Sequence, residues 1–206
     1  MDTKKTSLPH NFILTGNSLA INFANSTFGV DGNETLNSWK DVINFIKISE
    51  GLSSSPPQNS HRTKPLFARV LELRKVIRNI LESMVSQKAI KTSDLKFVNA
   101  LLFETADYDI IQVVFGKPLV KRRYYRQTPL ALLSPIVQNL LYLISTKSTS
   151  LIHKCARENC IYYFYDVSKT HKRKWCSMAV CGNREKVRAF NCKDTQNSRS
   201  KKSFSK

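Results

Sequence analysis

The 206-residue chain lacks the segments and motifs that would assign it to a membrane, to secretion or to an enzyme class. No apolar run approaches the length of a membrane span, and the run at residues 12–14 behind Lys4 and Lys5 is too short for the apolar region of a secretory leader. No phosphate-binding glycine loop, H-E-x-x-H, G-x-S-x-G or zinc-deaminase pattern occurs. These absences predict a cytoplasmic protein that is not an enzyme.

Acidic residues are scarce, since 15 Asp and Glu stand against 33 Lys and Arg, for a net charge of +18 at pH 7. The excess is concentrated toward the C-terminus. Residues 151–206 hold 14 basic and 4 acidic residues, which leaves +10, whereas residues 1–150 hold 19 and 11, which leaves +8. A positive field of this size favours polyanions, so nucleic acid is the expected partner.

Cysteine is absent from the first 154 residues, and the last quarter of the chain holds all five. Four of them form two pairs of equal spacing, Cys155-x4-Cys160 and Cys176-x4-Cys181, with fifteen residues between the pairs. Two thiol pairs at this separation can close on one tetrahedral Zn²⁺. Four thiolates fill the coordination sphere, so the predicted role is one structural Zn²⁺ per chain.

Three alternatives to zinc remain at this point: two disulfides, an iron–sulfur cluster, or unrelated buried thiols. The third explains neither the clustering nor the equal spacing. Cys192 lies outside the symmetric set and is expected to be a free thiol. His153 and His171 flank the cluster and could each replace a cysteine, although a lone histidine beside a zinc site is more often solvated or supporting.

The first 150 residues predict a mainly helical domain with one β-hairpin. The segment at 19–24 fits either a short strand or a helix from residue 17 or 18. Asp107 and Asp109 are better explained by solvation of the hairpin edge than by carboxylate chemistry. The expected elements are a helix over 36–51, a linker loop over 53–65, helices over 66–86 and from 92, a hairpin over 108–126 turning at 116–118, and a helix over 129–145.

The region around the cysteines predicts a compact module. The aromatic run 161–165 is typical of a strand over the metal site, and 168–174 of a cationic turn. Trp175 is expected to cover the core.

A helix over 178–190, capped by Ser177, should carry the second ligand pair. We expect Val180, Val187 and Phe190 to pack inward, with Arg184 and Arg188 on another face. The fold class predicted for the whole chain is α+β and mainly helical, with a small treble-clef-like four-cysteine zinc finger after the helical domain.

Two stretches resemble known families. Cys155-x4-Cys160, Phe164-Tyr165-Asp166-Val167-Ser168 and the run 173–184, RKWCSMAVCGNR, are similar to the CGNR zinc finger, whose naming tetrapeptide is Cys181–Arg184 here. That resemblance implies a zinc-binding, DNA-binding module of bacterial regulators. Leu19-x-x-x-Phe23-Ala24-Asn25-Ser26, Leu36-x-x-Trp39 and Leu73-Arg74-x-x-Ile77-Arg78 are similar to the ABATE domain of stress-responsive transcription regulators, with Asn22 where Asp is usual.

The predicted function is a DNA-binding, ligand- or stress-responsive transcription regulator. The predicted domains are a disordered N-terminus over 1–14, an ABATE-like sensor or dimerisation domain over 15–147, the finger over 151–191 and a basic disordered tail over 192–206. An unidentified effector and a homodimer are further expected partners. Arg184 and Arg188 are the first candidates for DNA contact. All residues predicted to contact DNA are Lys172, Arg173, Lys174, Asn183, Arg184, Lys186 and Arg188.

Two other functions stay open. An RNA-binding module could stack bases on Tyr162, Tyr163, Phe164 and Tyr165, although a core role is expected for at least half of them. A protein-interaction finger would use its charge only for solubility, and it predicts weak nucleic-acid affinity with little salt dependence.

Overall fold

The computed structural model describes residues 12, 14–27, 34–50, 63–124, 128–146 and 148–192. The predicted disordered ends lie almost wholly outside these ranges and remain predictions. The exceptions are Phe12, Leu14 and Cys192. Phe12 is buried and its ring meets that of Phe45 edge-on at 5.3 Å, and Leu14 packs against the same core. Cys192 is the last described residue of a helix. The described residues also exclude 51–62, which hold most of the predicted linker and Gly51, the predicted end of a helix.

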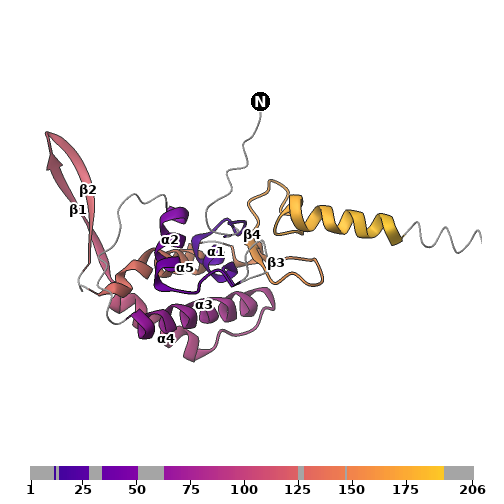
Figure 1. The fold of residues 1–206 in the computed structure, drawn as a ribbon, viewed down its shortest axis with the longest axis horizontal. Coiled ribbons are helices and arrows are strands. Elements are labelled where there is room, and N and C mark those ends of the chain that lie inside the picture. Colours follow the sequence, from indigo (N-terminus) through magenta and orange to yellow (C-terminus); the bar gives the residue numbers. More distant parts are fainter. Residues whose placement is uncertain are drawn as a thin grey trace, which may run out of the picture.

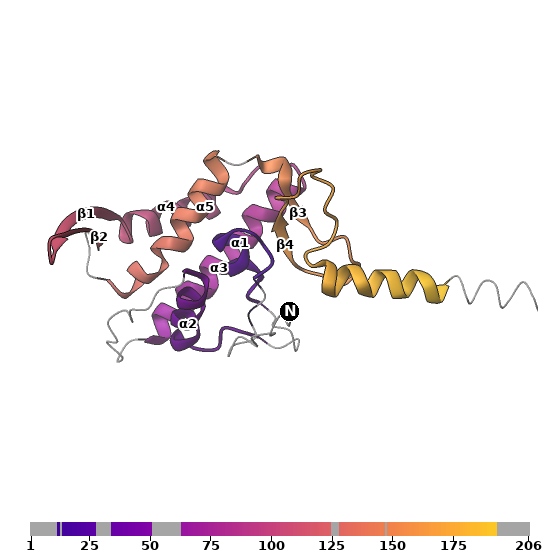
Figure 2. The same ribbon diagram turned by 90° about the horizontal axis from the view of Figure 1, so that it is seen from above.

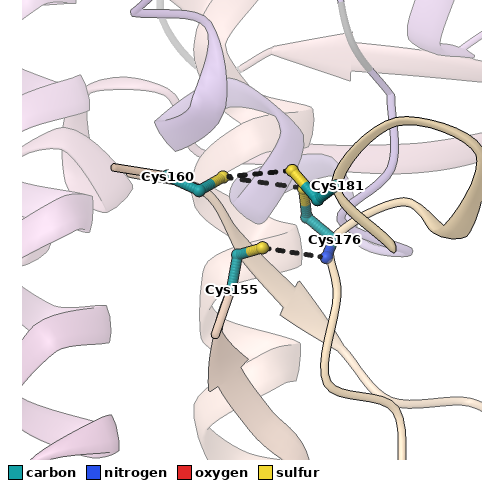
Figure 3. Close-up of side chains that lie close together, drawn as sticks. All are labelled: Cys155, Cys160, Cys176 and Cys181. Carbon is teal, nitrogen blue, oxygen red and sulfur yellow. Dashed lines mark hydrogen bonds between the residues drawn. The ribbon is translucent and has the colours of Figure 1, made fainter. Parts of the chain in front are cut away.

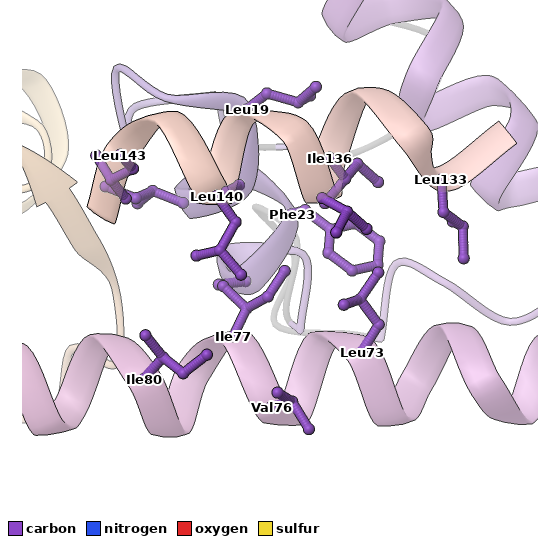
Figure 4. Close-up of a cluster of buried hydrophobic side chains, with 14 of the residues drawn as sticks. Leu19, Phe23, Leu73, Val76, Ile77, Ile80, Leu133, Ile136, Leu140 and Leu143 are labelled. Atoms are coloured by element: carbon purple, nitrogen blue, oxygen red, sulfur yellow. The ribbon is translucent and has the colours of Figure 1, made fainter. Parts of the chain in front are cut away.

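A bundle of helices forms the body of the molecule (Figures 1 and 2). The long α3 (Thr63–Val85) runs beneath α5 (Ser134–Thr146), and the short α1 (Leu19–Asn25) lies between them. Ile77 and Ile80 of α3 face Leu140 of α5 in this core (Figure 4). The remaining helices of the body are α2 (Trp39–Glu50), α4 (Thr92–Glu104) and the 3-10 turn η1 (Pro129–Leu133).

The ambiguous segment at 19–24 is a helix. Six of the seven α1 residues are buried, including Asn25, so the helix is enclosed on nearly all sides and its alternating pattern is not that of a half-exposed strand. Asn139 of α5 fixes its start, since its Oδ1 accepts from Ser18 Oγ at 2.7 Å and from Ala20 N at 3.0 Å. Asn22 has a structural contact, with its Oδ1 accepting from Gly16 N at 2.8 Å.

Three predicted helix boundaries were wrong. Helix α2 begins at Trp39, three residues after the predicted start. Helix α3 begins at Thr63, so Pro65 belongs to its first turn and not to the linker. Proline is tolerated there because the first backbone N–H groups of a helix have no partner within it. The helix predicted over 129–145 is divided, since Thr128 caps a 3-10 turn before α5 begins at Ser134.

The predicted hairpin is present as β1 (Asp107–Val114) and β2 (Lys117–Tyr124), paired antiparallel with Ile111 opposite Val120. Its turn lies one residue earlier than predicted. Phe115 and Gly116 both have positive φ, 48° and 74°, as the tight two-residue turns of hairpins require. Lys117 and Pro118 therefore belong to β2. The hairpin projects from one end of the helical body (Figure 1).

A second small sheet joins the finger to the body. It pairs β3 (Ile152–Lys154) with β4 (Tyr163–Tyr165), and a 3-10 turn, η2 (Thr149–Leu151), precedes it. Ile152, Tyr163 and Tyr165 belong to the same apolar core as the helices, so the finger is built onto the body. Within the described ranges, no helix has both the length and the apolar character needed to cross a membrane.

Candidate metal centre and nucleic-acid interface

The four predicted cysteines converge on one point between β3, β4 and the C-terminal helix (Figure 3). Cys155 follows β3, and Cys160 lies before β4. Cys176 lies in the loop beyond, and Cys181 lies in a π-turn, η3 (Met178–Gly182), that begins the helical region 178–192. Their sulfur atoms all lie within 4.8 Å of one another.

The sulfur positions fit a single tetrahedral ion. Cys160, Cys176 and Cys181 have Sγ–Sγ separations of 3.7 Å, 3.6 Å and 3.8 Å. Zinc–sulfur bonds of about 2.3 Å give a tetrahedron with edges of about 3.8 Å. Cys176 N also donates to Cys155 Sγ at 3.4 Å, an orienting contact for that ligand. The four side chains would hold one structural Zn²⁺, with no position left for a substrate.

The same geometry decides among the alternatives. No disulfide joins these cysteines, since all five thiols are free and bonded sulfurs would lie about 2.05 Å apart. An iron–sulfur cluster holds its thiolates on different metal atoms and requires wider separations. Within the described residues, neither His153, His171 nor the exposed Cys192 joins the cluster.

The charge of the cysteine cluster also calls for a cation. Hydrogen bonding to Cys155 raises the pKa of Cys160 to about 11 and also raises the pKa of Cys176. Thiolates this close repel one another, so without a cation some of the sulfurs keep their protons. A divalent ion removes this penalty, and its binding displaces those protons.

The conformation of the turn that carries Cys181 depends on Ser177 and Gly182. Ser177 caps it as predicted, since its Oγ accepts from Val180 N at 3.3 Å. A Cβ at Gly182 would collide with Met178 Sδ and would lie 3.1 Å from Trp175 Cδ1. The glycine of the C-G-N-R run is therefore explained by close packing against Met178 and Trp175.

Asp166 and Arg173 hold the cationic loop closed, and their roles were not predicted. The Asp166 carboxylate is fully buried and accepts from Ser168 N at 2.8 Å and Arg173 N at 2.9 Å. Burial opposes its ionisation, but hydrogen bonds outweigh burial and lower the pKa of the Asp166 carboxyl. Arg173 donates to the carbonyls of Thr15, Trp175 and Cys176, and its guanidinium lies 4.3 Å from the centre of the Phe164 ring. Arg173 is thus a structural residue of the finger.

The aromatic run beside the metal site is buried. Tyr162, Tyr163, Phe164 and Tyr165 are all 9% exposed or less, so all four have a core role where at least half were expected to. Burial also raises the pKa of Tyr162 to about 12.

The prediction that Val180, Val187 and Phe190 pack inward was wrong. They are 46%, 60% and 65% exposed, on a helix that projects from the body into solvent (Figures 1 and 2). Helical spacing places residues on one face but does not provide an element to cover that face. The metal site holds the first turn of this helix, and ion pairs from Glu185 to Arg157 and from Arg188 to Glu158 connect later turns to the first cysteine pair.

The predicted DNA-contact residues are in different situations. Lys172, Lys174, Lys186 and Arg184 are exposed, and the Arg184 side chain has no ion pair or hydrogen bond among the described residues. Together with Ala179, Val180, Asn183 and Val187, Arg184 forms one exposed face of the projecting helix.

Two other candidates have internal partners. Asn183 Nδ2 donates to Ala179 O at 3.2 Å. Arg188 pairs with Glu158 at 3.1 Å and with Glu185 at 3.7 Å, which links the helix to the first cysteine pair.

Side chains of the helical body also hold the finger in place. Arg78 of α3 donates to Ala24 O at 3.0 Å and to Ile161 O at 3.1 Å, next to the ligand Cys160. The hydroxyl of Tyr163 donates to Glu82 Oε2 at 2.5 Å, which lowers the pKa of the Glu82 carboxyl. The sequence signal for Arg78 was the L-R-x-x-I-R run in α3, which indicated a family but not these contacts, and Glu82 had no such signal.

Comparison with known families identifies both parts of the chain. Residues 17–147 match the ABATE family, described as "Putative stress-induced transcription regulator", and residues 152–193 match the CGNR zinc finger. The first match covers more than half of the 206 residues, so the chain belongs to the ABATE family and carries a C-terminal CGNR zinc finger. Comparison with the curated proteins gives no match.

Proposed function

We propose that the protein is a bacterial, cytoplasmic transcription regulator that binds duplex DNA through its zinc finger, and that the helical domain controls the finger in response to a ligand or stress. The observation that carries the proposal is the projecting helix 178–192, one exposed face of which includes Arg184. A helix fixed at one end by a metal centre can enter the major groove, where an arginine can pair with guanine through two hydrogen bonds.

The exposed apolar side chains on this helix suit the same role. Val180 and Val187 share an exposed helix face with Arg184. Apolar side chains in the major groove can contact the methyl group of thymine, so their exposure would be useful on DNA. Lys172, Lys174 and Lys186, which are exposed near the helix, would contact phosphate and position the finger.

Burial of the aromatic run weakens the RNA alternative. Base stacking requires exposed rings, and the four aromatic residues at 162–165 are core residues of the finger and body. The protein-interaction alternative retains support from the exposure of Phe190 and Met178, which are 65% and 59% exposed. The protein-interaction alternative predicts a nucleic-acid affinity that depends little on salt, whereas the proposal predicts a steep dependence.

Selection of bound sequences from a random duplex pool tests the proposal. We expect a defined motif to be enriched, with an affinity that falls steeply with salt. Six phosphate contacts imply a slope of roughly −5 in log K against log salt. A flat salt profile would favour the protein-interaction alternative, and tighter binding to single-stranded RNA than to duplex DNA would favour the RNA alternative.

A further inference from the structure

The β1–β2 hairpin leaves the helical body and forms a sheet of its own strands only, within the described part of the chain (Figures 1 and 2). An isolated two-stranded hairpin is marginally stable in water, and its edges expose unpaired backbone groups. Its base is anchored to α5, where Ser134 Oγ donates to Asp107 Oδ2 at 2.5 Å. A strand pair of this length needs a covering surface.

The two faces of the hairpin differ in chemistry. Ile111 lies opposite Val120, and Val113 opposite Pro118, so these four residues share one side, which we name the apolar hairpin face. Ile111, Val113 and Val120 are 76%, 73% and 64% exposed. The other side pairs Ile110 with Lys121 and Tyr108 with Arg123, and it also holds Lys117.

We propose that the apolar hairpin face is the surface through which two copies of this chain dimerise. Two copies that each carry a net charge of +18 repel one another. We therefore expect them to meet through a surface that does not carry net positive charge. A two-fold interface brings the same patch of both copies together. The four residues of the apolar hairpin face carry no charge. Self-contact of the opposite side would bring three cations of each copy together.

The exposed area supports a small dimer interface. Phe115 at the tip is fully exposed, and together with Ile111, Val113 and Val120 it presents on the order of 600 Å². A specific interface buries roughly 800 Å² on each partner. The hairpin supplies most of that area, which predicts a reversible, concentration-dependent dimer.

The position of the hairpin is compatible with DNA binding. The hairpin and the projecting helix 178–192 lie at opposite ends of the molecule, so a hairpin-mediated dimer leaves both fingers free (Figure 1). Binding of two fingers to one duplex depends on the proposed DNA-binding function. Dimerisation does not depend on that function, so it is measured in the absence of nucleic acid.

Sedimentation equilibrium of the zinc-loaded full chain over a range of concentrations tests the surface. We expect the parent protein to dimerise and Val120→Glu to raise the dimer Kd about tenfold or more. Leu119→Glu is the matched control, because Leu119 is the next residue, is 51% exposed and lies on the opposite side. Both variants reduce the net charge equally, so general repulsion cannot explain a difference. Ile111→Glu provides a second variant of the same face.

Three outcomes would overturn the proposal. A parent protein that stays monomeric at every concentration would do so, as would equal weakening by Val120→Glu and Leu119→Glu. If the protein is monomeric and Lys121→Ala weakens its binding to DNA, the hairpin is a nucleic-acid-binding element instead. Loss of DNA binding by a protein that still dimerises through this face would contradict only the proposed function.

Discussion

Asn25 and Tyr163 are hydrogen-bonded as neighbouring residues of a β-ladder would be. Asn25 Nδ2 donates to Tyr163 O at 2.7 Å, and Tyr163 N donates to Asn25 Oδ1 at 2.9 Å. The side chain of the last α1 residue thus completes the outer edge of β4, 138 residues later in the chain. Because β4 follows Cys160, this pair connects the helical body to the metal centre.

Replacing Asn25 should destabilise both parts together. Asn25→Ala leaves a buried N–H and a buried C=O of Tyr163 without partners, which we expect to cost about 3 kcal/mol in the free energy of unfolding. Zinc release to a chelator should become faster in the same variant. Asn37→Ala is the control, since Asn37 is exposed and bonds only locally. If Asn25→Ala lowers the free energy of unfolding but leaves the rate of zinc release unchanged, the helical body and the metal centre are not coupled through this residue.

The metal content depends on four of the five cysteines. We expect one Zn²⁺ per chain by elemental analysis and a loss of zinc on dialysis of Cys176→Ser, because zinc affinity requires the complete thiolate set. Cys192→Ser should keep one Zn²⁺, since Cys192 is exposed and lies outside the cluster. Iron in the purified protein, or zinc loss from Cys192→Ser, would contradict the assignment.

A buried arginine makes stability dependent on pH. The guanidinium of Arg74 meets the Glu34 carboxylate with two bonds of 2.7 Å, and the Arg74 side chain is buried. Burial opposes ionisation of Glu34, but hydrogen bonds from Arg74 and Leu36 N outweigh it and lower the pKa of that carboxyl. A lowered pKa stabilises the fold above the ordinary value of 4.5, and this stability is lost as pH falls through the folded value.

Glu34→Gln should therefore cost about 1 kcal/mol at neutral pH, a value reduced by solvent screening because the Glu34 side chain is 36% exposed. Its difference from the parent should shrink as the pH falls below 4.5. Denaturant unfolding at a series of pH values measures both. Glu104→Gln is the control, because the Arg69–Glu104 pair is also 2.7 Å long and its carboxylate is as exposed as that of Glu34, at 33% against 36%, whereas Arg69 is 34% exposed and Arg74 only 10%. An exposed pair of this kind is worth about 0.2–1 kcal/mol. Equal losses in the two variants would contradict the role of burial.

The sequence predicted the metal centre well because its information is local. Ligand type and spacing alone indicate a tetrahedral thiolate site, and apolar periodicity was sufficient for α3 and α4. Arg173 could not be told from Lys172 and Lys174, because its role depends on the carbonyl of Thr15, 158 residues earlier. The exposure of Val187 and Phe190 depends on what lies opposite the helix, which no local pattern contains.

The last prediction separates base recognition from phosphate binding. Arg184→Ala should weaken specific duplex binding more than non-specific binding, because a two-bond contact with a base is worth about 1–3 kcal/mol of discrimination. Lys172→Ala should weaken both alike, since a phosphate contact carries no sequence information directly. The Arg184 side chain has no hydrogen bond or ion pair among the described residues. Its removal should therefore leave the melting temperature and zinc retention unchanged. Fluorescence anisotropy with the selected site and a scrambled duplex, beside thermal unfolding of the same variants, measures all of these. Loss of stability in Arg184→Ala with an unchanged ratio of the two affinities would exclude base recognition and make Arg184 a structural residue of the metal turn.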